Sequence, residues 1–121
     1  MIEVIALASR KNGDVVVSVA DDALPAPFDA LAQRGGLGVG LCLRSERPPS
    51  GSLATLSGLR VSEAAAPWPT TLRGRAIPEA LQANPTVSAL ALVEALLAGV
   101  AATVALAHAA PRPFVLDVTP A

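Results

Sequence analysis

The strongest constraint on the fold is the segment Asn84–Ala110, in which Glu94 is the only side chain with a formal charge at neutral pH. Asn84 can cap a helix with its side-chain oxygen, and Pro85 suits the first helical position because its missing N–H is not needed there. The prolines that follow Ala110 cannot continue helical hydrogen bonding. The sequence therefore predicts one long helix over residues 85–109.

Apolar side chains occur on every face of this predicted helix. They form two stripes, Val87, Leu90, Val93, Leu97, Val100 and Val104 on one, and Leu92, Leu96, Gly99, Thr103 and Leu106 on the other. A surface helix has a polar back, so we expect this one to be covered by a sheet, a partner subunit or a bilayer. The membrane is disfavoured, because a central acid such as Glu94 costs about 2.5–3.5 kcal/mol on insertion scales.

The composition limits the classes of function. The chain has 121 residues, which suffices for one domain over residues 1–121, and it is 52% apolar but only 16% charged. With so few charges, we expect apolar surface to face a partner protein or a second copy in a homo-oligomer. A net charge of -1, and no aromatic residues among the basic ones, argue against nucleic acid as a partner.

Cysteine and histidine usage excludes two further kinds of site. Cys42 is the only cysteine, so no internal disulfide can form, and we interpret it as a small core residue. No cluster of Cys and His has metal-binding spacing, so no metal site and no cofactor are predicted. Met1 leads directly into Glu3 without a signal segment, and a cytoplasmic location is expected.

Strand patterns fill the first part of the chain. Residues 2–10 and 14–20 read as two strands joined by Asn12-Gly13, a dipeptide typical of a hairpin turn. The glycines at 35–40 lack the Lys-Ser/Thr of a phosphate loop, and they lead into a strand that begins at Leu37. Gly38 and Gly40 leave one face of that strand bare, against which we expect the long helix to lie.

The remaining pattern completes an α+β prediction. Residues 53–61 suggest a strand with a bend at Ser57-Gly58, and a short helix is expected to begin near Pro78. Residues 114–119 suggest a last strand, at the sheet edge and parallel to an earlier strand. The expected architecture is a small mixed sheet that starts with a β-hairpin and packs on one long buried C-terminal helix.

Several residues are candidates for binding. Arg44 and Arg47 lie in a polar loop, where they could meet a small anionic ligand, although solvent exposure explains them equally well. Trp68 stands between two prolines, as a lid on the core or as an interface anchor. Asp21 and Asp22 could hold a metal or serve in acid–base chemistry, but a plain strand exit is the favoured interpretation.

Two residues of the long segment are candidates for catalysis. Glu94 is an acid in an apolar helix, and His108 falls in the predicted last turn, where the helix dipole favours its protonated form. A cavity that contained Glu94 beside His108 or an arginine would favour an enzyme. Glu94 that is exposed, or simply paired with a backbone group, would leave the hypothesis of a protein without catalysis standing.

Two stretches carry a resemblance to a known family. They are IEVIALASRKNGDVVVSVADDALPAPFDAL and LRGRAIPEALQANPTVSALALVEALL. The first resembles the opening hairpin of the crotonase (enoyl-CoA hydratase/isomerase) superfamily, and the second resembles a helical stretch of some short members. The resemblance implies a reduced relative or a partner subunit. The family's oxyanion hole has no counterpart at residues 35–40, so no functional residue carries over.

The sequence thus leaves two hypotheses of function. The first is a small oligomeric or partner-binding protein without catalytic apparatus. The alternative is a small enzyme or ligand-binding subunit that acts on an anionic or acyl-CoA thioester substrate, with Arg44, Arg47, Glu94 and His108 as its candidate residues.

Overall fold

The computed structural model describes residues 7, 10, 13–21, 36–46, 50–82, 84–106 and 111–121. The elements in chain order are β1 (Asp14–Asp21), β2 (Leu37–Arg44), β3 (Ala54–Val61), β4 (Thr71–Leu72), β5 (Arg75–Ala76), α2 (Glu79–Gln82), the 3-10 helix η2 (Pro85–Ala89), α3 (Leu90–Ala98), β6 (Ala102–Ala105) and β7 (Phe114–Pro120). Helices and strands both occur, as an α+β chain requires, but strands predominate.

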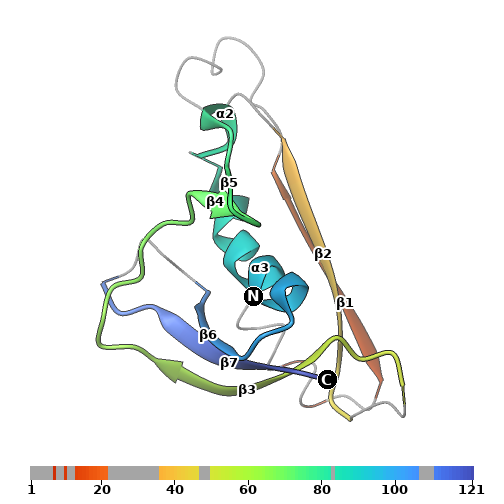
Figure 1. Ribbon diagram of the computed structural model, residues 1–121. Coiled ribbons are helices and arrows are strands. Elements are labelled where there is room, and N and C mark those ends of the chain that lie inside the picture. Colours follow the sequence, from red (N-terminus) through yellow and green to blue (C-terminus); the bar gives the residue numbers. More distant parts are fainter. Residues whose placement is uncertain are drawn as a thin grey trace.

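In the described part of the chain, the strands form three antiparallel sheets. β1 pairs with β2 along eight residues, β4 pairs with β5 around a tight turn, and β7 lies between β3 and β6. Figure 1 shows α3 between the tall β1–β2 ribbon and the three-stranded sheet. The helix therefore has a sheet on each of two sides.

The core lies along α3. Leu92 and Ala95 of the helix pack with Leu116 of β7 and Val104 of β6, and Leu41 of β2 reaches the same cluster from the ribbon. A second cluster is built on Ile77, Val87 and Leu90, with Leu37, Val39, Trp68, Leu72 and Leu81 packed against it. Together the two clusters join the ribbon, the helices and the larger sheet.

The predicted long helix is wrong beyond its first half. Its start is confirmed, because the Asn84 side chain accepts a hydrogen bond from the Thr86 N–H and Pro85 follows it. The five-residue η2 and the nine-residue α3 end at Gly99, whose φ of 63° is left-handed. Such a residue ends a helix. The chain then forms β6 instead of continuing to residue 109. In the described part of the chain, no helix is long and apolar enough to cross a membrane.

The predicted opening hairpin is also wrong in its pairing. The second predicted strand is confirmed as β1, but the partner of β1 is β2, with Asp14 opposite Arg44 and Asp21 opposite Leu37. Leu7 and Arg10 are helical, and the other residues of the predicted first strand lie outside the described residues. The Asn-Gly signal is local, whereas the strand partner was decided by the packing of β2 on the core.

The glycines of β2 do not face the helix. Gly38 and Gly40 are exposed, and their neighbours Leu37, Val39 and Leu41 are the residues packed against the two core clusters. Side chains alternate between the faces of a strand, so the larger side chains of β2 took the buried face. The expected contact between a bare glycine face and the helix is therefore wrong.

The last strand is confirmed, but its predicted place is not. β7 lies in the middle of its sheet and runs antiparallel to both neighbours, where an edge position and a parallel neighbour were expected. The bend in the third strand is confirmed at the register shift between Ser57 and Arg60, and the short helix near Pro78 is α2.

Candidate functional site

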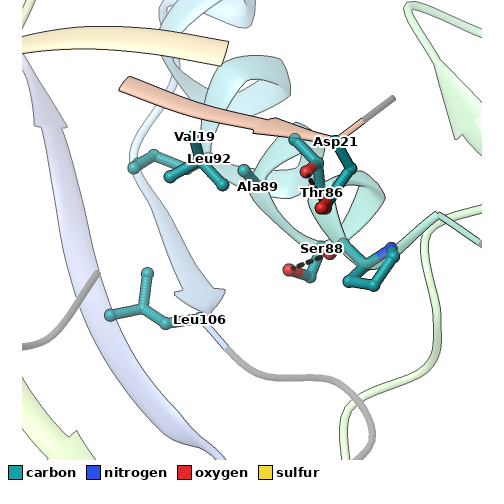
Figure 2. A pocket seen from close by; sticks show the side chains of 8 residues that line it. Val19, Asp21, Thr86, Ser88, Ala89, Leu92 and Leu106 are labelled. Carbon is teal, nitrogen blue, oxygen red and sulfur yellow. Dashed lines mark hydrogen bonds between the residues drawn. The ribbon is translucent and has the colours of Figure 1, made fainter. Parts of the chain in front are cut away.

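A hollow of ≈ 170 Å³ opens between the end of β1, η2 and Leu106 at the end of β6. It is lined by Val19, Asp21, Pro85, Thr86, Ser88, Ala89, Leu92 and Leu106. Figure 2 shows the polar side chains on one side of the hollow, and Val19, Leu92 and Leu106 on the other. The hollow thus has a polar end and an apolar end.

Thr86 fixes the polar end. Its side chain is 2% exposed, and its Oγ1 hydroxyl donates a hydrogen bond of 2.7 Å to Oδ2 of Asp21. Its backbone N–H donates to Oδ1 of Asn84 at 2.8 Å, so the cap of η2 holds the residue in place. The contact joins the exit of β1 to η2, which are 65 residues apart in sequence.

Ser88 adds a second hydroxyl to the same end. Its Oγ donates a hydrogen bond of 2.9 Å to the carbonyl oxygen of Pro85, one turn earlier in η2. Both hydroxyl hydrogens at this end are therefore directed at oxygen atoms of the protein. Their lone pairs remain as acceptors.

The apolar end is part of the core. Leu92 is 1% exposed and belongs to the main cluster, with Leu106 packed against that cluster. Val19 lies on the inward face of β1, beside buried Val17. The positions of Leu92 and Leu106 at this end are therefore set by the packing of the main core cluster.

Arg44 is engaged in an ion pair at the end of the ribbon. Its Nε and Nη2 donate to Oδ1 and Oδ2 of Asp14 at 2.5 and 2.8 Å. The hydrogen bond from Arg44 holds the pKa of the Asp14 carboxyl below its ordinary value, and the same bond raises the pKa of Arg44. The Arg44 guanidinium, a candidate for binding an anion, is thus paired with Asp14 at one end of the β1–β2 ladder.

Glu94 holds a turn and lies outside the hollow. Its Oε2 accepts a hydrogen bond of 2.5 Å from the backbone N–H of Arg73. Arg73 and Gly74 form the turn between β4 and β5, and Arg73 has a φ of 51°, which is rare for a residue other than glycine. Pairing with a backbone group is the outcome that leaves the hypothesis of a protein without catalysis standing.

Trp68 covers the second core cluster. It packs against that cluster, and its Nε1 donates a hydrogen bond of 2.9 Å to the carbonyl oxygen of Gln82 in α2. This contact supports the interpretation of Trp68 as a lid on the core.

The other predicted site residues are not brought together by the described structure. Arg47, His108 and Asp22 lie outside the described residues. Among the residues that are described, no group of three or more His, Cys, Asp or Glu side chains could hold a metal ion. Cys42 is exposed, so the expectation that it is a core residue is wrong.

Sequence reasoning weighed Asp21 but missed Thr86 and Ser88. A signal was present, since these two hydroxyls stand at the start of a segment that is otherwise almost entirely apolar. Their meeting with Asp21 depends on the contact of η2 with β1, which no local pattern encodes.

No protein-family model matches the sequence, and no curated protein and no solved structure matches it significantly.

Proposed function

We propose that the protein is a non-catalytic module that associates with a second copy of itself through the β1–β2 ribbon. The observation that carries the proposal is the outward face of this ribbon. Its exposed positions are Asp14, Val16, Ser18 and Ala20 on β1, and Gly38, Gly40, Cys42 and Arg44 on β2. Between the Asp14–Arg44 pair and the far end of the ladder, this face carries no charge.

Val16 supports the choice of this face. It is the most exposed of the large apolar side chains in the described part of the chain, at 75%. Its neighbours across the ladder are small, with Cys42 directly opposite Val16 and Gly40 opposite Ser18. A flat surface of small side chains around one apolar side chain permits close approach of an identical surface.

The backbone edges of the ribbon also support association with a second copy of the chain. Within the described residues, β1 pairs only with β2, so each of the two strands keeps one edge without a partner. Natural edge strands are usually protected by lysine, proline or inward charges, and the eight-residue β1 and β2 have none of these between their end residues. Unprotected edges of this kind favour coverage of the ribbon by a second copy, in keeping with association through its outward face.

The state of the candidate catalytic residues favours this proposal over an enzyme. Arg44 is bound to Asp14, and Glu94 is bound to the backbone of Arg73. The hollow presents the Asp21 carboxylate, which disfavours an anionic or thioester substrate that carries phosphates. Low overall charge adds to the case for a covered surface.

Size-exclusion chromatography with light scattering tests the proposal. We expect the unmodified protein to be a dimer or larger, and Val16→Lys to shift it to the monomer without loss of folded structure, because the side chain is outside the core. Leu53→Lys is the matched control, since Leu53 is 71% exposed and lies directly before β3, outside the β1–β2 ribbon. A monomeric unmodified protein at high concentration would overturn the proposal, and so would loss of association in Leu53→Lys alone.

A further inference from the structure

We infer that the hollow between β1, η2 and Leu106 binds a small primary ammonium ion with a short apolar body. The inference does not depend on the proposed association, because the hollow lies on the inward side of β1 and the proposed contact uses the outward side. The inference rests on the hydrogen-bonding groups of the hollow that remain available to a ligand.

Among the described lining residues, the side chains at the polar end of the hollow offer only acceptors. A hydroxyl has one hydrogen, and the hydrogens of Thr86 and Ser88 are directed at Asp21 and at the Pro85 carbonyl oxygen. An ionised carboxylate has no donor at all. A ligand that satisfies this end must therefore bring donors, and a positive charge complements the carboxylate of Asp21.

A primary ammonium fits this requirement better than other small groups. It has three N–H donors and no acceptor, so none of its atoms opposes the lone pairs of Asp21, Thr86 or Ser88. An alcohol has a single donor and adds lone pairs of its own. An anion would face the Asp21 carboxylate, and like charges repel. A divalent metal is disfavoured, because Asp21 is the one carboxylate among the described lining residues.

The apolar end sets the body of the ligand. Val19, Leu92 and Leu106 supply carbon surface opposite the polar groups, and Ala89 lies between the two ends (Figure 2). The hollow measures ≈ 170 Å³, and an apolar cavity of about 150 Å³ accommodates a benzene molecule. Isoamylamine has as many heavy atoms as benzene, so a branched or cyclic monoamine of that size is the class of ligand that we infer.

The test compares three probes of nearly equal shape on the unmodified protein. Isoamylamine carries a positive charge, isoamyl alcohol is neutral and isovalerate is negative. With nitrogen-15 spectra to follow the amides of Thr86 and Ser88, we expect saturable shifts with isoamylamine. We expect binding of the alcohol and of isovalerate to be at least about tenfold weaker, as the loss of a hydrogen bond to a charged group implies. Equal affinity for amine and alcohol, or shifts that never saturate because only water fills the hollow, would overturn the inference.

Asp21→Asn locates the charge. The amide oxygen can still accept the Thr86 hydrogen bond, so the contact between β1 and η2 is kept while the negative charge is lost. We expect affinity for isoamylamine to fall about tenfold or more, with little change for isoamyl alcohol. Asp14→Asn is the matched control, because Asp14 lies at the other end of β1 against Arg44. An equal loss in both variants, or none in Asp21→Asn, would overturn the inference. The three probes decide the question even if Asp21→Asn fails to fold.

Discussion

Arg60 and Asp117 form a two-point ion pair across the β3–β7 ladder, with Nη1 2.7 Å from Oδ2 and Nη2 3.0 Å from Oδ1. Thr103 of β6 donates a further hydrogen bond of 2.7 Å to Oδ1 of the same carboxylate. Because β7 is the middle strand, one acid connects it to both neighbouring strands. The hydrogen bonds from Arg60 and then Thr103 lower the pKa of Asp117 below its ordinary value of 3.8.

The lowered pKa predicts that Asp117 stabilises the fold in a pH-dependent way. A carboxyl whose pKa is lower in the folded state contributes its full stabilisation above its ordinary pKa of 3.8, and loses it as the pH falls through the folded-state value. Asp117→Asn should therefore be less stable than the unmodified protein at neutral pH, with the difference shrinking in acid. Urea unfolding from neutral to acidic pH measures this. Thr103→Val keeps the charge and should retain most of the pH dependence. A stability difference that is constant with pH would contradict the prediction.

Gly58 makes room for this ion pair. Its φ of 63° is left-handed, and a Cβ at this position would lie 2.6 Å from Oδ2 of Asp117 and 3.0 Å from Nη1 of Arg60. Gly58→Ala should lower the free energy of unfolding by about 1–3 kcal/mol from backbone strain, plus the displacement of the pair. Gly99→Ala is the control. Gly99 has the same φ, but a Cβ added at Gly99 would meet no atom within 4 Å. Equal effects of the two substitutions in urea unfolding would show that the ion pair simply moves aside.

The elements that the sequence predicted well are those with local signals. Asn84 and Pro85 specify the start of η2 by their own chemistry, and Ser57-Gly58 marks the bend in β3. The helix after Pro85 was predicted too long because apolar residues on every side are equally consistent with a buried helix and a buried strand. Gly99 supplied the missing stop signal, and β-branched Thr103 and Val104 favoured the strand.

The candidate site was harder to predict than the fold. Asp21 and Thr86 meet only because β1 and β2 pair across a gap in sequence and then pack on η2. Hydrophobic period and turn chemistry describe single segments, so they do not encode which segment packs on which. For the same reason, the partners of Arg44 and Glu94 could not be named in advance.

Glu94 gives a prediction about local order. If the Glu94 carboxylate holds the turn between β4 and β5, Glu94→Ala should release the Arg73 N–H and cost about 1 kcal/mol of stability. Hydrogen exchange of the Arg73 amide should speed up, while exchange in β7 should change little. Glu94→Gln keeps an acceptor and should retain part of the protection. Unchanged exchange of Arg73 in Glu94→Ala would mean that the turn is stable without this contact.

Leu92 gives a prediction about the core. It is 1% exposed and contacts the ribbon side and the sheet side of the main cluster. Leu92→Ala should therefore cost about 2–5 kcal/mol in the free energy of unfolding, from lost apolar burial and the cavity that remains. Leu97→Ala, five residues further along the same helix and 53% exposed, should cost less than about 0.5 kcal/mol. Similar losses in thermal or urea unfolding would contradict the placement of α3 between the two sheets.

Cys42 reports on the proposed contact between copies. It is exposed on the outward face of β2, directly opposite Val16. If two ribbons meet through this face, the thiol should react with Ellman's reagent rapidly in dilute protein and more slowly as the protein concentration rises. In Val16→Lys the rate per thiol should not depend on protein concentration, because the contact is lost while the thiol stays at the surface. A rate that is independent of concentration in the unmodified protein, combined with a dimeric mass from light scattering, would place the contact on another surface.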